Sequence, residues 1–312
     1  MKPRVIQIGR LQASLEQRLA EEFDTHPLWR ESDQAAFLAQ HGGRFVGMAT
    51  SIRLGADAKL MDALPALRVI ANFGVGYETI DVAAARQRGI AVSNTPDVLT
   101  ECVADLAMGL VIDVGRGLSA ADRFVRRGDW TRAQFPLATR VSDKRLGILG
   151  LGRIGRAIAR RAEGFGMQIR YHNRGTVGDV AYSRAPSPIE LARWSDFLVI
   201  AAAASASTRN LVSSDVMEAL GTKGFLINIA RGSVVDEPVL VRALGEKRIA
   251  GAALDVFADE PNVPLALMEL DNVVLLPHIS SATHDTRKAM GDLVIENLHA
   301  FFSTGQLKTP VP

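Results

Sequence analysis

The sequence predicts an α/β protein with parallel sheets, because short apolar stretches alternate with turns and helix-patterned segments along the chain. No low-complexity stretch or short repeat interrupts this alternation. Early strands are expected at Arg4–Ile8, Phe45–Ala49, Arg68–Asn72 and Ala91–Ser93, with helices at Leu15–Glu22 and Asp81–Arg88. Gly89 follows basic residues at the end of the second of these helices, which is a typical helix stop.

A second series of strands begins near residue 145. Its runs are nearly continuously apolar, as expected for strands buried on both faces of a parallel sheet. They are Arg145–Leu149, Gln168–His172, Phe197–Ala201, Gly224–Asn228, Gly251–Asp255 and Val273–Leu276. Two series predict two domains, joined near Asn94-Thr95-Pro96-Asp97, before a long helix over Val98–Val114. A last helix over His284–Phe302 is compatible with either domain.

Composition narrows the class of protein. The 312 residues suffice for two domains, and 47% hydrophobic with 22% charged residues is typical of a soluble globular protein. Basic and acidic residues number 36 and 34, so the net charge of +2 does not favour binding to nucleic acid or to an anionic membrane. The longest apolar run, Phe197–Ala204, is too short to cross a bilayer. The single cysteine, Cys102, excludes an intrachain disulfide, and we expect a cytoplasmic protein.

A glycine-rich turn follows the first strand of the second series. The segment reads Gly150-Leu151-Gly152-Arg153-Ile154-Gly155 and precedes a helical run through Phe165. The pattern GxGxxG alone is weak evidence and could be a structural turn, but between a strand and a helix it predicts a dinucleotide site. Gly150 would permit the tight turn, Gly152 the approach of a pyrophosphate, and Gly155 the packing of helix on strand, with the helix N-terminus favouring the anion.

The next strand indicates which dinucleotide binds. NAD sites carry an acidic residue about 20 residues after the glycines, where it holds the ribose 2′-hydroxyl. No acid lies between Met167 and Gly178, and Asn173-Arg174 ends the strand instead. The Arg174 guanidinium suits a 2′-phosphate, which favours NADP(H) over NAD(H), although a solvated surface arginine would look the same.

Three charged residues in the second half are candidates for catalysis. Arg231 and His278 each follow a predicted strand, at the edge where parallel sheets bind ligands, and Glu260 lies in the segment Asp255–Pro261. Taken singly, the arginine could be an ion-pair partner, the histidine a packed or capping residue, and the glutamate a solvated side chain. Their order along the chain makes a shared site the better interpretation.

At this point the chain resembles the D-2-hydroxyacid dehydrogenase family over essentially its full length. Six motifs carry the resemblance: Asn72-Phe73-Gly74-Val75-Gly76, Thr100–Asp105, the Gly150–Gly155 turn, Ala230-Arg231-Gly232, Asp255–Pro261 and Pro277–Thr283. Within the family it is most similar to the NADP-dependent glyoxylate/hydroxypyruvate reductases and the hydroxyphenylpyruvate reductases, helped by Tyr171-His172-Asn173-Arg174. Two departures are the run Ala201–Ser205, where relatives usually carry a proline-containing turn, and Ser280, where glycine is common.

The resemblance implies a role for each candidate. His278 would protonate the substrate oxygen as hydride reaches the carbonyl carbon, and Glu260 would orient the imidazole and keep a proton available. Arg231 would polarise the 2-oxo group and hold the adjacent carboxylate. The N–H groups of Val75 and Gly76 would bind the carboxylate as a small anion nest.

The resemblance also implies a set of cofactor contacts, in which Asp255 would meet the nicotinamide carboxamide. The full set is Thr100, Gly150, Gly152, Arg153, Ile154, Gly155, Asn173, Arg174, Ile229, Asp255, His278 and Ser281. No metal ligand set is expected.

In domain organisation, the resemblance implies two Rossmann-like or flavodoxin-like domains with parallel sheets. The NADP-binding domain, 97–282, would be inserted in a substrate-binding domain formed by 1–96 and 283–312. Family members are usually homodimers built around the long helix, so Trp130 would reach toward a partner's site or simply be buried in the interface.

The predicted activity is therefore NADPH-dependent reduction of a small 2-oxo acid, of the glyoxylate or hydroxypyruvate type, to the D-2-hydroxy acid. Three alternatives stay open: an aromatic 2-oxo acid, another hydride donor such as formate or phosphite, and a non-catalytic nucleotide-sensing protein. Lactate- and malate-type dehydrogenases are disfavoured, because their glycine turn lies near the N-terminus. The sequence does not choose the physiological acid or the direction of the reaction.

Overall fold

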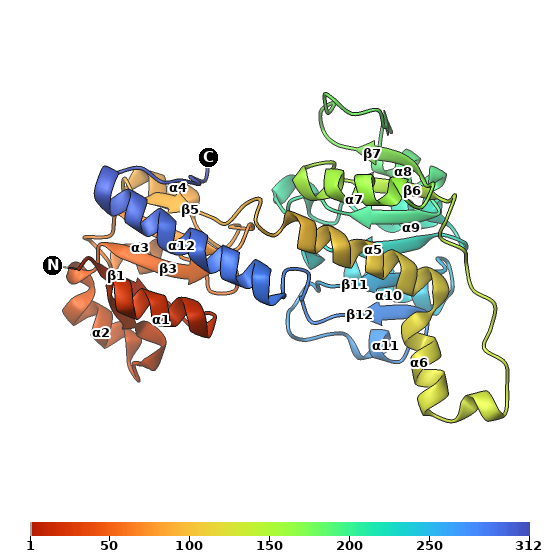
Figure 1. Ribbon diagram of the computed structural model, residues 1–312, viewed down its shortest axis with the longest axis horizontal. Coiled ribbons are helices and arrows are strands. Elements are labelled where there is room, and N and C mark those ends of the chain that lie inside the picture. Colours follow the sequence, from red (N-terminus) through yellow and green to blue (C-terminus); the bar gives the residue numbers. More distant parts are fainter. Residues whose placement is uncertain (1) are drawn as a thin grey trace. The chain divides into compact units, whose positions relative to one another are not determined.

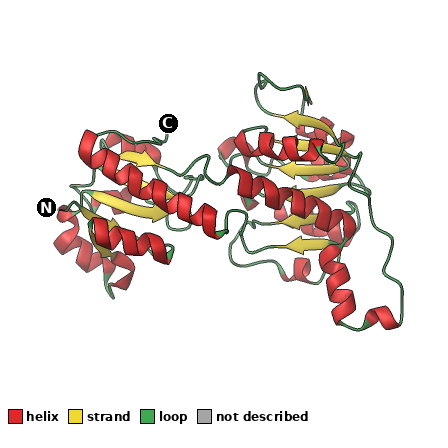
Figure 2. Ribbon diagram, viewed as in Figure 1, coloured by secondary structure: helices red, strands yellow, loops and turns green. Residues whose placement is uncertain are grey.

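The computed structural model describes residues 2–312, which form two α/β units, one of residues up to Leu99 with Ser281–Pro312 and the other of Thr100–Ser280. Each unit has one sheet enclosed by helices (Figure 2). Every strand pair within the two sheets is parallel, which confirms the predicted fold class.

The first unit has a five-stranded sheet in the order β2-β1-β3-β4-β5, a flavodoxin-like arrangement. Its strands are β1 (Arg4–Gln7), β2 (Asp24–Pro27), β3 (Gly47–Ser51), β4 (Val69–Phe73) and β5 (Ala91–Ser93). Its helices are α1 (Ala13–Glu22), α2 (Gln34–His41), α3 (Ala58–Asp62), α4 (Val82–Gln87) and α12 (His284–Thr304).

Helix α12 packs on α1 and β4, although 210 residues lie between β4 (ending at Phe73) and α12 (beginning at His284) in the sequence (Figure 1). Buried side chains including Val294, Leu298 and Phe301 form its contact face. Asn297 on this helix donates a hydrogen bond to Thr309, which lies beyond the helix, and Pro310 pairs with the edge strand residue Ser93. The C-terminal segment is therefore part of the first unit.

The second unit has a seven-stranded sheet in the order β12-β11-β10-β9-β6-β7-β8. Its strands are β6 (Arg145–Leu149), β7 (Gln168–His172), β8 (Ser183–Arg184), β9 (Phe197–Ile200), β10 (Phe225–Asn228), β11 (Gly251–Leu254) and β12 (Val273–Leu275). Six of these strands follow the Rossmann order, in which successive strands are added outward from β6 on one side through β7 and then on the other side from β9, so that the strand order reverses between β6 and β9. Ligands of such sheets bind outside the carboxyl ends of the strands at this point.

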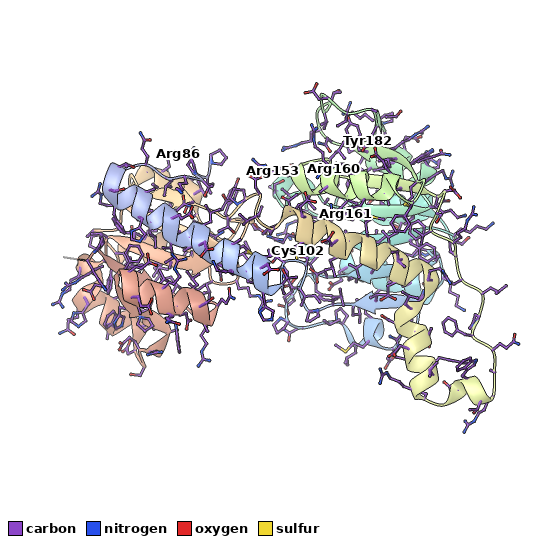
Figure 3. All side chains as sticks on the ribbon, viewed as in Figure 1. Arg86, Cys102, Arg153, Arg160, Arg161 and Tyr182 are labelled. Carbon is purple, nitrogen blue, oxygen red and sulfur yellow. The ribbon has the colours of Figure 1, made fainter. Side chains whose placement is uncertain are left out.

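Two layers of helices cover this sheet. They include α5 (Thr100–Arg116), α7 (Arg153–Glu163), α8 (Pro188–Trp194), α9 (Ser214–Leu220) and α10 (Glu237–Gly245), while α11 (Leu265–Met268) packs near β12 and α6 (Leu118–Arg126) extends from the end of α5. Helices α5 and α7 lie side by side on one face, and α8, α9 and α10 on the other (Figure 1). Arg160 and Arg161 on α7 form ion pairs with Glu101 on α5 (Figure 3).

An ion pair links the two central strands, β6 and β9, at their amino-terminal ends. Arg145 at the start of β6 donates two side-chain hydrogen bonds and one backbone bond to Asp196, which precedes β9. Burial raises the pKa of the Asp196 carboxyl, but the hydrogen bonds from Arg145 outweigh it, and the pKa lies below its ordinary value. The carboxylate therefore stays ionised and ties the two central strands.

All ten predicted strands are confirmed to within two residues at each end, and Ala91–Ser93, Arg145–Leu149 and Gln168–His172 match their predicted bounds. The prediction that all strands of the second series are buried on both faces was wrong for β7, where Gln168 and Arg170 are exposed. The reason is that its outer neighbour β8 has only two residues and covers little. The long helix begins at Thr100 rather than Val98, after a left-handed turn at Asp97 (φ 66°).

Within the described residues 2–312, no helix combines the length and the apolar character that a membrane crossing requires.

Candidate active site

The glycine-rich turn joins β6 to α7 at the point where the strand order reverses. Gly150 has a φ of 103°, and a Cβ there would lie 2.5 Å from the Ala202 backbone nitrogen that follows β9. A Cβ on Gly155 would lie 2.3 Å from the Gly150 carbonyl oxygen. Both positions therefore require glycine, since only glycine lets the turn, the helix and the neighbouring strand approach so closely.

The space around Gly152 fits a bound pyrophosphate. Gly152 is the N-cap of α7, is exposed, and has no atom within 4 Å of the position that a Cβ would take. The eleven-residue helix that starts here directs its first N–H groups and its positive dipole end toward this open space. Arg153 is exposed beside it, and Ile154 is half-buried. These features suit the diphosphate of a dinucleotide.

The end of β7 lies next to the turn. Asn173 Oδ1 accepts a hydrogen bond from the Leu151 N–H at 2.6 Å, so the asparagine ties the strand end to the glycine turn. The exposed Arg174 follows, and its guanidinium donates to Ser207 Oγ at 3.5 Å. Arg184, on the edge strand β8, donates to the carbonyl oxygens of Asn173 and Arg174 at 3.0 and 3.1 Å.

The sequence analysis did not identify Ser207 or Arg184. Ser207 lies in a 3₁₀ turn (Ala206–Thr208) whose cap is Ser205, and Ser205 Oγ is 3.0 Å from Ser207 Oγ. The departure from the family pattern at Ala201–Ser205 was the feature of the sequence that could have pointed to Ser207, because it indicates an altered loop after β9. The structure brings a hydroxyl from this loop and two guanidinium groups to the end of β7.

Arg231 follows β10 and is held by a buried amide. Asn228, only 1% exposed, donates through Nδ2 to the Arg231 carbonyl at 3.0 Å and accepts from the Ala230 N–H at 3.1 Å. Both ends of one side chain therefore fix the segment 228–231. Ile229, another expected cofactor contact, is 5% exposed within it.

Gly232 brings the Arg231 segment against the loop that carries Glu260. A Cβ on Gly232 would lie 1.9 Å from the Phe257 carbonyl carbon and 2.3 Å from the Ala258 nitrogen. Glu237, at the start of α10, also accepts a hydrogen bond from the Ala258 N–H at 2.9 Å. The loops after β10 and β11 are thus in direct backbone contact, which no larger residue at position 232 permits.

His278 and Glu260 form the central pair of the site. His278 Nδ1 lies 2.7 Å from Glu260 Oε2, with side chains 20% and 26% exposed, and Glu260 Oε1 accepts from the Phe257 N–H at 3.2 Å. A carboxylate only accepts, so Nδ1 carries the shared proton and the other ring nitrogen, Nε2, is the one a ligand can use. This arrangement can hold and deliver a proton at Nε2.

Asp255 binds the backbone that follows His278. Its side chain is 0% exposed, and its two oxygens accept from the N–H groups of Ile279 and Ser280 at 2.7 and 3.0 Å. Its expected contact with a nicotinamide carboxamide stays a prediction, as does that of Thr100, which begins α5.

The remaining expected site residues, Val75, Gly76 and Ser281, belong to the first unit. Asn94 donates to the Val75 carbonyl and Asn72 to the Gly76 carbonyl, each at 2.8 Å. No acceptor for the N–H of Val75 or Gly76 occurs among residues 2–312, so both donors can bind an anion. The same described residues contain no group of three or more His, Cys, Asp or Glu side chains arranged for a metal ion.

A Rossmann sheet with an open glycine turn, and a carboxylate–imidazole pair at the same sheet edge, is typical of NAD(P)-binding oxidoreductases. Residues 108–280 match the NAD-binding domain of the D-isomer specific 2-hydroxyacid dehydrogenases, and the chain belongs to this family. The match confirms the resemblance inferred from the sequence.

Three similar proteins indicate where in the family the chain lies. It is 47% identical to glyoxylate/hydroxypyruvate reductase A of Arabidopsis thaliana over 98% of each chain, and 48% identical to hydroxyphenylpyruvate reductase of Plectranthus scutellarioides over 95% of each. A crystal structure of the NADPH-dependent glyoxylate/hydroxypyruvate reductase of Sinorhizobium meliloti, in complex with NADP and malonate, superposes with a TM-score of 0.92. It is 45% identical and covers 100% of this chain and 97% of that one.

Alanine substitutions at Gly152 and Gly155 distinguish an effect on NADPH binding from an effect on folding stability. Gly152→Ala should leave the fold intact, with a loss of less than about 1 kcal/mol for the changed N-cap, and raise the Kd for NADPH at least ~10-fold because the methyl group fills the phosphate space. Gly155→Ala should destabilise the protein by about 2 kcal/mol or more, because its methyl group collides with backbone. Thermal unfolding and fluorescence titration with NADPH measure both effects. Unchanged NADPH affinity in Gly152→Ala would show that the phosphates bind elsewhere.

Proposed function

We propose that the protein is an NADPH-dependent reductase that converts a small 2-oxo acid of the glyoxylate or hydroxypyruvate type to the D-2-hydroxy acid. The observation that carries the proposal is the 2.7 Å hydrogen bond between His278 Nδ1 and Glu260 Oε2, at the same sheet edge as the open glycine turn. The similarity to two glyoxylate/hydroxypyruvate reductases over nearly the whole chain supports it.

In the proposed reaction the reduced nicotinamide supplies the hydride, and the protein supplies the proton and the binding of charge. His278 donates the proton from Nε2 to the substrate oxygen, while Glu260 holds Nδ1 and stabilises the charged ring. Arg231 polarises the 2-oxo oxygen and binds a carboxylate oxygen, which fixes the orientation of the carbonyl carbon. In the first unit, the N–H groups of Val75 and Gly76 are the proposed donors to a carboxylate oxygen.

The preference for NADPH rests on the charges at the end of β7. A 2′-phosphate requires cations and hydroxyl donors, whereas a free ribose hydroxyl requires an acceptor such as a carboxylate. The cations and the hydroxyl group suited to a 2′-phosphate are supplied by Arg174, Arg184 and Ser207. The NADP complex of the Sinorhizobium meliloti reductase, at 45% identity, agrees with this choice.

An aromatic 2-oxo acid is the second candidate substrate, because hydroxyphenylpyruvate reductase is as similar to this chain as the glyoxylate/hydroxypyruvate reductases are. Both candidates share the proton donor, the arginine and the cofactor. They differ only in the group attached to the carbonyl carbon, so a panel of acids separates them.

Turnover with a panel of acids tests the proposed activity. NADPH oxidation, followed at 340 nm, should be fastest with glyoxylate or hydroxypyruvate and slower with pyruvate and hydroxyphenylpyruvate. His278→Ala should lower kcat at least ~100-fold because the general acid is lost, with the Kd for NADPH changed less than about threefold.

Four results would contradict the proposed activity, and each indicates a different alternative. Hydroxyphenylpyruvate as the best substrate would establish the aromatic acid, and reduction of NADP by formate or phosphite would indicate another donor. NADPH binding without turnover of any acid would favour a sensing protein, and full activity of His278→Ala would remove the proposed proton donor.

A charge reversal at the end of β7 tests the cofactor preference. Arg174→Asp should lower the ratio of kcat/KM for NADPH over NADH by about 100-fold, because a carboxylate repels the 2′-phosphate and accepts from the ribose hydroxyl. Arg86→Asp is the matched control, since Arg86 is an exposed arginine on α4 of the first unit (Figure 3). An unchanged ratio in Arg174→Asp would place the 2′-phosphate elsewhere.

We also propose that the protein is a homodimer, formed through α6 and the segment that follows it. Leu118 and Val125 lie seven residues apart on one face of α6 and are 50% and 54% exposed. Trp130 and Leu137, in the following segment, are 69% and 104% exposed. Exposed apolar side chains clustered on one element are characteristic of subunit interfaces.

Light scattering tests the dimer directly. The wild-type protein should have twice the mass of one chain, and Val125→Asp should shift it toward the monomer because a charge is buried in the interface. Leu54→Asp is the control, because Leu54 is 42% exposed in a turn of the first unit, outside the proposed interface. A monomeric wild-type protein would end the proposal.

A further inference from the structure

The proposed carboxylate site after β4, the segment Gly74–Gly76, has all three of its carbonyl groups bound from within the first unit. Asn72, only 1% exposed, donates through Nδ2 to the first and the third of them at 3.2 and 2.8 Å. Asn94 Nδ2 donates to the middle one, that of Val75, at 2.8 Å. The conformation of the segment is therefore set by two asparagine side chains.

Asn94 controls the direction of one of the N–H groups proposed to bind the anion. The Val75 carbonyl and the Gly76 N–H belong to one planar trans peptide, so they point in opposite directions. The bond from Asn94 to this carbonyl therefore directs the Gly76 N–H away from Asn94. In the same way, the bond from Asn72 to the Gly74 carbonyl directs the Val75 N–H.

The main chain of Asn94 is itself held by a residue from the far end of the sequence. Thr309 Oγ1 donates to the Asn94 carbonyl at 2.6 Å, and the Asn94 N–H donates to the Thr309 carbonyl at 3.4 Å. The Val311 N–H donates to the Val92 carbonyl on β5 at 2.8 Å. The C-terminal segment, residues 305–312, therefore runs back from α12 to β5 and binds both backbone groups of Asn94 (Figure 1).

A buried side chain of α12 holds Thr309 in turn. Asn297 is 0% exposed, its Nδ2 donates to Thr309 Oγ1 at 2.9 Å, and its Oδ1 accepts from the Thr309 N–H at 3.0 Å. The same Nδ2 also donates to the Leu293 carbonyl at 2.8 Å. A buried amide that lost these partners would be costly, so the arrangement is strongly favoured. Continuous hydrogen bonds thus join α12 through Thr309 and Asn94 to the Val75 carbonyl.

We infer that the C-terminal segment is a positioning element for the proposed carboxylate site, because Thr309 fixes Asn94 in the place from which it holds the Val75 carbonyl. The inference rests on the proposed function, in which the N–H groups of Val75 and Gly76 bind the substrate carboxylate. Thr309 needs no contact with the substrate in this role, since it acts through Asn94.

The competing role of the C-terminal segment is purely structural. The segment covers the edge strand β5, and Val311 packs against the apolar core of the first unit. Covering a sheet edge and burying an apolar side chain both stabilise a fold. In that role, loss of the Thr309 hydroxyl group lowers stability without weakening the binding of an acid. The two roles therefore differ in the KM for the acid.

Thr309→Val tests the inference with little change in shape. Valine neither donates to the Asn94 carbonyl nor accepts from Asn297. We expect the KM for the 2-oxo acid to rise at least ~5-fold, roughly the contribution of one hydrogen bond. The kcat at saturating acid should change less than about twofold, because a carboxylate contact acts equally in the ground state and the transition state. The Kd for NADPH should be unchanged, because the glycine turn belongs to the second unit.

Two further variants serve as controls. Thr309→Ser keeps the hydroxyl group and should retain the wild-type KM. Thr25→Val is the matched control, because Thr25 is a half-buried threonine of β2, at the opposite edge of the same sheet, and its hydroxyl donates to the Leu19 carbonyl at 2.8 Å. This variant loses a comparable hydrogen bond and should keep the wild-type KM even where its Tm falls. An equal rise in KM in Thr25→Val and Thr309→Val would overturn the inference.

A double substitution tests whether Thr309 acts through Asn94. In Asn94→Ala the bond to the Val75 carbonyl is already absent, so the addition of Thr309→Val should raise KM by less than about a further twofold. Full additivity of the two effects would mean that Thr309 acts by another route, and the inference would be wrong.

Binding of a carboxylate probe separates this inference from the proposed function. Oxamate, which carries a carboxylate but accepts no hydride, should shift the amide NMR signals of Val75 and Gly76 in the NADPH complex. Its Kd should rise at least ~5-fold in Thr309→Val. If the wild-type protein reduces no 2-oxo acid, the proposed function fails, and the Kd for oxamate still tests the inference. An unchanged Kd, or no shift of either amide signal in the wild-type protein, overturns it.

The wild-type protein also provides a test if Thr309→Val fails to fold. The N–H groups of Thr309 and Val311 should exchange slowly with deuterium, although neither residue lies in a helix or strand, because both are hydrogen-bonded to the first unit. Rapid exchange of both would show that the C-terminal segment does not hold Asn94, and the inference would fail.

Discussion

The parallel arrangement of the seven-stranded sheet is the constraint on which the candidate site depends. Every strand ends at the same edge, so the loops after β6, β7, β9, β10, β11 and β12 all emerge there. Neighbouring strands are only about 4.8 Å apart, which leaves little room between these loops. Glycine makes this close approach possible at Gly150 beside Ala202 and at Gly232 beside Phe257, where a Cβ would overlap backbone atoms.

Carboxylates that accept hydrogen bonds from backbone N–H groups fix the loops of the candidate site relative to one another. Asp255 binds the segment after His278, Glu260 binds the Phe257 N–H as well as the imidazole, and Glu237 binds the Ala258 N–H. Bonds between a carboxylate and an amide are stronger than neutral hydrogen bonds and fix direction as well as distance. The proposed proton donor, His278, is therefore held by interactions that lie within the loops after β10, β11 and β12.

The sequence was sufficient for the sheet of the second unit because buried parallel strands are apolar along their length, as in Phe197–Ile200 and Phe225–Asn228. It missed β2 (Asp24–Pro27) and β8 (Ser183–Arg184), which are polar edge strands with no apolar signature. The glycine turn and the residues Arg231, Glu260 and His278 were predicted from motifs. Ser207, Arg184 and the amide clamp of Asn228 were not, because their contacts depend on loops brought together only by the folded sheet.

The residue proposed to set the cofactor preference and the residue proposed to donate the proton follow different strands of the sheet. Arg174 follows β7 and His278 follows β12, five strand spacings away in the sheet order, or roughly 24 Å. Groups this far apart without shared contacts contribute nearly independently to binding and to rate. A change at the end of β7, where we propose that the 2′-phosphate binds, is therefore expected to leave the proposed proton donor His278 undisturbed. The glycine turn after β6 lies between these two positions in the strand order, where the phosphates of the proposed dinucleotide would connect its two ends.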